Sequence, residues 1–109
     1  MDKQRVHKRP IACDLSAIDA THRQRHQALW QQVYPTAQGI EELPDGYAIR
    51  FPMDRERFMA LAEYITLERL CCPFFDFALE LGGGSETIHL RLTGRDGVKS
   101  FLQAQLGIT

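Results

Sequence analysis

The chain has 109 residues and a mass of 12.5 kDa, which fits a single domain. Hydrophobic residues make up 44% and charged residues 25% of the chain, a balance typical of globular proteins that excludes a disordered chain or a fibre. The net charge of −1 excludes a strong overall attraction to nucleic acid or to anionic membranes.

Residues 1–12 predict a basic, flexible arm ahead of one domain at 13–109. The arm lacks the apolar stretch of a signal peptide, and no run of the chain is long enough to span a membrane, so we expect a cytoplasmic protein without a membrane partner. No recognition helix accompanies the basic residues, and a nucleic-acid partner is not expected. In a reducing cytosol the three cysteines are expected as free thiols or metal ligands rather than as disulfides.

A first helix is predicted from about residue 16 to residue 33. Ser16 and Asp19 have the spacing of a capping box, and a proline shortly after the helix stops it. A hairpin follows at 38–51, because the sequence LPDG at 43–46 is a strong turn pattern between two alternating apolar stretches.

A second helix is predicted to begin at Asp54 and to end before Pro73. Alternating apolar residues over 74–93 predict a second hairpin around the glycine-rich turn at 82–85. The last helix is expected from about Asp96 to Leu106, followed by a glycine that ends it.

This order of helix, hairpin, helix, hairpin and helix predicts an α+β fold. We expect a four-stranded antiparallel sheet of two hairpins with the helices packed on one face. The other sheet face would meet solvent or a partner, and it carries Asp76, Glu80, His89 and Arg91. A four-residue turn would place Asp76 opposite Arg91 as a cross-strand pair.

Two adjacent cysteines, Cys71 and Cys72, stand where Pro73 stops the second helix. Adjacent thiols can both reach one thiophilic ion, and thiolates select such ions. Glu68 lies one helical turn before Cys72 and can add an oxygen ligand. The sequence therefore predicts that this pair binds a soft metal ion or metalloid, or senses redox state.

Two further residues are expected to support this site. Cys13 would supply a third sulfur if its segment packs beside the end of the second helix, and Arg69 would hold Glu68 or temper the charge of the thiolates. The expected cofactor is a thiophilic metal ion. Its predicted ligands are Cys71, Cys72, Glu68 and Cys13, with Arg69, Pro73 and Phe74 in supporting positions.

His22 and His26 have the i, i+4 spacing that can place two imidazoles on one metal. The residues between them do not match the pattern of a zinc protease. Both lie in the apolar stripe of the first helix, so we expect a packed or surface pair rather than a zinc site.

Other functions compete with metal binding. A reactive thiolate is favoured at a helix N-terminus, whereas Cys71 and Cys72 stand at a helix C-terminus and lack the C-x-x-C spacing. A thiol enzyme therefore ranks last, and we assign no catalytic residue. Cysteine is often a core residue, and if these two are core residues the chain is a non-catalytic interaction module. Such a module would be a homodimer formed through the open sheet face or through exposed hairpin aromatics.

The segments ERLCCPFFDFALEL and IHLRLTGRDGVKSFL resemble a small bacterial protein family. Its members share Glu-Arg-x-Cys-Cys-Pro-Phe, an aromatic strand and a Leu-Thr-Gly-x-x-Gly-Val-Lys tail. The resemblance extends from LPDGYAIRFP onward. No activity is established for that family, so it implies no catalytic residue. It singles out Glu68, Arg69, Cys71, Cys72, Pro73 and Phe74.

Overall fold

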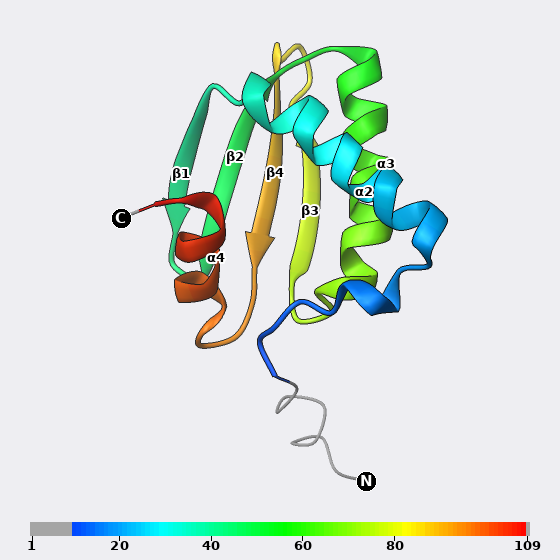
Figure 1. The fold of residues 1–109 in the computed structure, drawn as a ribbon. Helices are drawn as coiled ribbons and strands as arrows, with labels where there is room; N and C mark the ends of the chain where they lie inside the picture. The colour runs from blue at the N-terminus through cyan, green and yellow to red at the C-terminus, as the bar shows by residue number, and fades with distance from the viewer. Residues whose placement is uncertain (1–9, 109) are drawn as a thin grey trace, which may run out of the picture.

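Four antiparallel strands form one sheet in the order β1-β2-β4-β3 in the computed structural model, which describes residues 10–108 (Figure 1). The two hairpins pair with each other through β2 and β4, the central strands. The predicted α+β fold is therefore confirmed. The strands are β1 (Gly39–Leu43), β2 (Gly46–Pro52), β3 (Asp76–Leu81) and β4 (Thr87–Thr93).

The helices cover one face of this sheet (Figure 1). α2 lies against α3, and α4 lies over the half of the sheet that contains β1 and β2. The three α-helices are α2 (Ala20–Val33), α3 (Arg55–Cys71) and α4 (Val98–Leu106). Two short 3-10 helices, η1 (Leu15–Ala17) and η2 (Tyr34–Thr36), flank α2. None of the helices within residues 10–108 is both long enough and apolar enough to cross a membrane.

The first helix begins later than predicted, and Asp19 rather than Ser16 is its N-cap. The Asp19 carboxylate accepts a hydrogen bond from the backbone N–H of His22 at 3.0 Å. Ser16 lies in η1 instead, where its backbone N–H donates to the Asp14 carboxylate. The capping-box prediction was wrong because Asp14 and Asp19 each cap a separate helix, whereas the predicted helix merged the two.

The limits of α3 agree with the prediction. Asp54 caps its first turn, and the helix ends at Cys71, two residues before Pro73. The last helix starts at Val98 instead of Asp96, because Gly97 has a φ of 97°, in the left-handed region that a right-handed helix excludes.

The second hairpin has a different register from the predicted one. Asp76 lies opposite Thr93, and Ala78 lies opposite Arg91. The difference arises because six residues, 82–87, separate the paired residues Leu81 and Ile88, two more than a four-residue turn has. Arg91 therefore reaches Glu80, with 3.6 Å between guanidinium and carboxylate, rather than Asp76.

The open sheet face carries charged side chains that pair with one another across the strands. Glu41 lies 3.4 Å from Arg50 and 3.5 Å from His89. The hairpin aromatics do not add an apolar patch to this face, because Phe74 and Phe75 are buried and Phe77 is half-buried. The expectation of exposed hairpin aromatics was therefore wrong for the described residues.

Ile11 lies within the predicted arm at 1–12 but is half-buried and packs against the core. The rest of the predicted basic arm, residues 1–9, lies outside the described residues.

Candidate functional site

The segment around Cys13 is held against the C-terminal end of α3. The backbone N–H of Asp14 donates to the carbonyl of Cys71 at 2.8 Å. Ile18, which follows η1, is buried in the core and anchors the segment. These contacts bring Cys13 beside Cys72, with 4.8 Å between their Cα atoms although the two residues are 59 positions apart.

Cys13 and Cys72 are joined by a disulfide. This corrects the expectation that the three cysteines are free thiols or metal ligands rather than disulfides. Sequence spacing did not reveal the pair, because the return of the chain across 59 residues depends on the packing of η1 against α3. The two adjacent cysteines therefore have different chemical states, and Cys71 is the free thiol.

Cys71 lies between the disulfide and an acidic group. Its Sγ is 3.5 Å from Cys72 Sγ and donates a hydrogen bond to Glu68 Oε1 at 3.3 Å. The side chain is only 1% exposed. Burial, and then the negative charge of Glu68, raise the pKa of the Cys71 thiol to about 12. The thiol is therefore protonated at neutral pH.

Within the part of the chain that the structure describes, Glu68 is the one charged residue that is buried. Its partner is His26. His26 Nε2 lies 2.8 Å from Glu68 Oε1, which joins α2 to α3. The imidazole stacks on Tyr64, with 5.0 Å between ring centroids. Burial and the Glu68 charge raise the pKa of the Tyr64 hydroxyl above its ordinary range, so Tyr64 stays neutral.

Two sets of three donor groups meet at this point and share Cys71. One set is Cys13, Cys71 and Cys72, and the other is His26, Glu68 and Cys71. Within each set the sulfur, nitrogen and oxygen atoms all lie within 4.8 Å of one another. Sulfur, imidazole and carboxylate are the ligands that Zn²⁺ and related ions take in proteins.

The sequence predicted four of these five residues and missed His26. The structure brings the three sulfurs together, including that of Cys13, and places Glu68 in the second set, which it shares with Cys71. His22 and His26 separate, because His22 pairs with Asp19 at 2.7 Å on the surface while His26 turns inward. The indications in the sequence were the i, i+4 spacing of His26 from His22 and the position of His26 in the apolar stripe of its helix.

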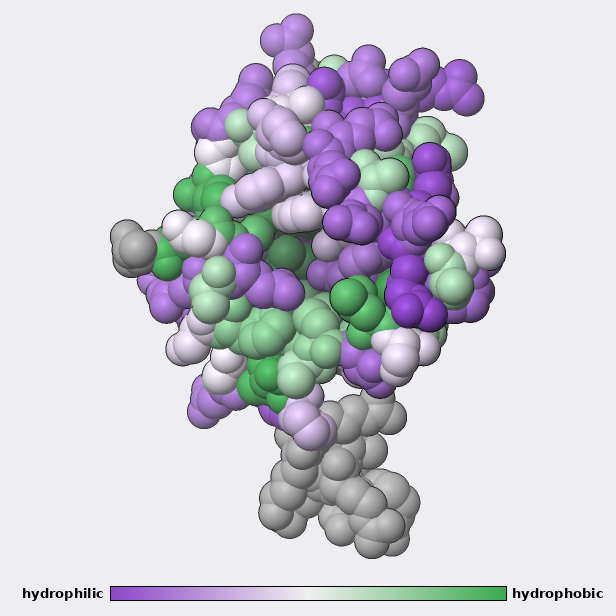
Figure 2. Space-filling model, in the orientation of Figure 1, coloured by the Kyte–Doolittle hydropathy of each residue, from purple (hydrophilic) through white to green (hydrophobic). Residues whose placement is uncertain are grey.

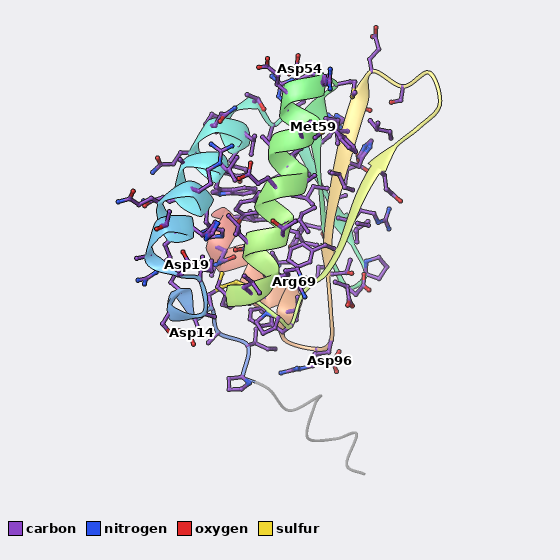
Figure 3. The ribbon with its side chains drawn as sticks, turned by 90° about the vertical axis from the view of Figure 1, so that its right-hand side faces the viewer. Asp14, Asp19, Asp54, Met59, Arg69 and Asp96 are labelled. Atoms are coloured by element: carbon purple, nitrogen blue, oxygen red, sulfur yellow. A yellow bond between two sulfur atoms is a disulfide. The ribbon has the colours of Figure 1, made fainter. Side chains whose placement is uncertain are left out.

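The supporting residues have other roles than expected. Arg69 is exposed on α3, near the end opposite to Asp54, and does not hold Glu68, whose partner is His26 (Figure 3). Pro73 is exposed and follows the helix end. Phe74 is buried, and its ring lies edge-on against Phe101 of α4, with 5.1 Å between centroids.

A cavity of about 600 Å³ lies between α2 and α4 and reaches these groups. Figure 2 shows a hollow near the centre of this face with apolar residues at its floor. Leucines and the rings of α2 and α3 supply apolar lining, glutamines of α2 and α4 supply neutral polar groups, and four of the five donor residues border it. These four are Cys13, His26, Glu68 and Cys71.

No family of known proteins, no curated protein and no solved structure matches this chain.

Proposed function

We propose that the protein binds one thiophilic metal ion or metalloid through Cys13, Cys71 and Cys72 when the disulfide is reduced. Glu68 and His26 would complete the ligand set. The observation that carries this proposal is the convergence of three sulfurs, a carboxylate and an imidazole from three separate segments of the chain. A hydrophobic core does not require this combination of sulfur, carboxylate and imidazole groups.

The chemistry of the donors favours a soft cation. A bound cation replaces the protons of the thiols. Its positive charge compensates the negative charge of the thiolates, which burial alone makes unfavourable. The His26–Glu68 hydrogen bond orients the imidazole and the carboxylate before an ion arrives. Of the residues in this site, Cys71 belongs to both donor sets and is expected to be indispensable.

The disulfide makes such a site dependent on redox state. When Cys13 and Cys72 are bonded to each other, two of the three thiolates are lost to the ion, and Cys71, Glu68 and His26 remain. Disulfides of cytosolic proteins are usually transient or redox-sensing. The proposal therefore places the protein in the cytoplasm, where reduction opens the site and oxidation closes it.

The test is a titration of the reduced protein with Cd²⁺, followed by the thiolate-to-metal charge-transfer absorbance. We expect one ion per chain, weaker binding by the oxidised protein, and no tight binding by Cys71→Ala. His26→Ala should weaken binding, whereas His22→Ala, a matched change on the surface of the same helix, should leave it unchanged. Equal Cd²⁺ binding by Cys71→Ala and the unchanged protein contradicts the proposal.

The alternative of a homodimer formed through the open sheet face has less support. The charged groups on this face already pair with each other, as Glu41 does with Arg50 and Glu80 with Arg91. A dimer would have to desolvate these pairs. Sedimentation at two concentrations tests this alternative, which requires a mass that rises with concentration.

A further inference from the structure

We propose that the cavity between α2 and α4 binds a small, uncharged organic thiol, which opens the Cys13–Cys72 disulfide by forming a mixed disulfide with Cys13. This ligand would set the redox state of the metal site, and in that respect the inference rests on the proposed function. The exchange itself needs no metal ion, so it is tested separately.

The two sulfurs of the disulfide differ in their access to the cavity. Cys72 is 0% exposed and does not border the cavity, whereas Cys13 is half-buried and is part of its wall. Thiol–disulfide exchange requires a thiolate to reach one sulfur of the disulfide. A thiol in the cavity can therefore attack Cys13, with Cys72 as the leaving group.

Cys71 is placed to stabilise Cys72 as the leaving group. Cys71 Sγ lies 3.5 Å from Cys72 Sγ, and its thiol is a hydrogen-bond donor to Glu68. By turning toward Cys72 it can donate a hydrogen bond to the thiolate that forms there. Cys71 in turn is hydrogen-bonded to Glu68, and Glu68 is hydrogen-bonded to His26. A path of proton donors and acceptors therefore leads from Cys72 toward the cavity.

The lining of the cavity is apolar at its walls and neutral at its rim. Leu92, Leu102 and Leu106 supply apolar surface, and Trp30 and Tyr64, stacked with 4.7 Å between centroids, add rings. The amides of the rim are neutral and come from Gln24, Gln27, Gln31 and Gln105.

Charged residues of the lining have hydrogen-bond partners within the protein. Glu68 is paired with His26, and Arg23 donates to the carbonyl of Ile18 at 2.8 Å. The leucines, the rings and the neutral amides of these walls fit an uncharged ligand with an apolar body, and the volume is in the range of small-molecule sites.

The step is a balanced exchange without an external oxidant. The thiol of the ligand gives its proton to solvent water, and its sulfur forms a bond with Cys13 Sγ. The bond between Cys13 and Cys72 breaks, and its electron pair goes to Cys72 Sγ. Cys72 then takes a proton through Cys71, and the net result is a mixed disulfide on Cys13 and a thiol on Cys72. The ligand sulfur is oxidised to the disulfide level, and Cys72 is reduced.

The experiment uses the oxidised, metal-free protein with benzyl mercaptan and, for comparison, 2-mercaptoethanol. The rate of mixed-disulfide formation is measured by mass spectrometry at equal thiolate concentration, because thiolates are the reactive species. Benzyl mercaptan should react about tenfold faster, since burying about 60 Å² of its apolar surface corresponds to a factor of that size. Peptide mapping should locate the adduct on Cys13.

Two neighbouring glutamines of α2 provide a matched pair of variants. Gln31 lines the cavity and Gln32 does not, and both are exposed. Gln31→Trp should narrow the cavity, so that benzyl mercaptan no longer reacts faster than 2-mercaptoethanol. Gln32→Trp should leave the faster reaction of benzyl mercaptan unchanged. Equal rates for the two thiols, an adduct on another cysteine, or an unchanged preference in Gln31→Trp would each overturn the inference. If the protein fails to bind Cd²⁺ but still reacts faster with benzyl mercaptan at Cys13, the proposed function is contradicted and the thiol site is supported.

Discussion

His26 and Glu68 meet at 2.8 Å although 42 positions separate them, and both side chains are nearly removed from solvent. The contact links α2 to α3 and holds Glu68 where it accepts the hydrogen bond of the Cys71 thiol. A buried carboxylate needs such partners, because burial of an unpaired charge is costly. The pair is therefore both a structural link and part of the proposed metal site.

Replacement of this imidazole should destabilise the fold. His26→Phe keeps a ring that can stack on Tyr64 but removes the hydrogen bond to Glu68, and we expect a loss of about 1–3 kcal/mol in the free energy of unfolding. Urea denaturation measures this loss. His22→Phe is the control at an exposed position and should cost less than about 1 kcal/mol. Equal costs for the two variants would contradict the structural role of His26.

Reduction of the disulfide should lower stability without abolishing the fold. The bond closes a loop of 59 residues, and loop-closure entropy predicts a loss of up to about 4 kcal/mol on reduction. Urea midpoints with and without a reductant measure the difference. Cys13→Ser should unfold at the same midpoint in both conditions, whereas Cys71→Ala should keep the response, because Cys71 is outside the disulfide. A reductant effect that persists in Cys13→Ser would contradict the assigned bond.

The Cys71 thiol should make stability depend on alkaline pH. Its pKa is about 12 in the folded protein against an ordinary value of 9.0, so the unfolded chain loses this proton at a lower pH. The stabilising contribution is complete below about pH 9 and is lost as the pH rises toward 12. Cys71→Ala should lack this component, and the difference between the two stability profiles isolates it from other alkaline titrations. Parallel profiles from pH 9 to 12 would show that the thiol is not perturbed.

The first hairpin turn depends on a glycine for a close contact between strands. A Cβ on Gly46 would lie 1.9 Å from the carbonyl oxygen of Leu92, a backbone atom of β4 that cannot move aside cheaply. Gly46→Ala should therefore destabilise the protein by about 1–3 kcal/mol. Gly83→Ala meets nothing within 4 Å and is the matched control, expected to change stability little. Thermal unfolding of the two variants tests the β2–β4 register directly.

The sequence by itself determined the secondary structure and the fold class. Alternating and helical apolar patterns, together with Asp54, Pro73 and the LPDG turn, are local features, and they located both hairpins and the limits of α3. The same local reasoning identified the cysteine pair at the helix end. It failed where two nearby caps competed, at Ser16 and Asp19, and where a longer connection shifted the pairing of Asp76.

Only the tertiary structure decided how the chemical groups combine. Cys13 reaches Cys72 because η1 packs on the end of α3, and His26 reaches Glu68 because α2 lies along α3. Neither contact has a local pattern, since each joins side chains about forty to sixty positions apart. The adjacent cysteines therefore differ in state: packing places Cys72 against Cys13 in a disulfide and leaves Cys71 as a buried thiol beside a carboxylate.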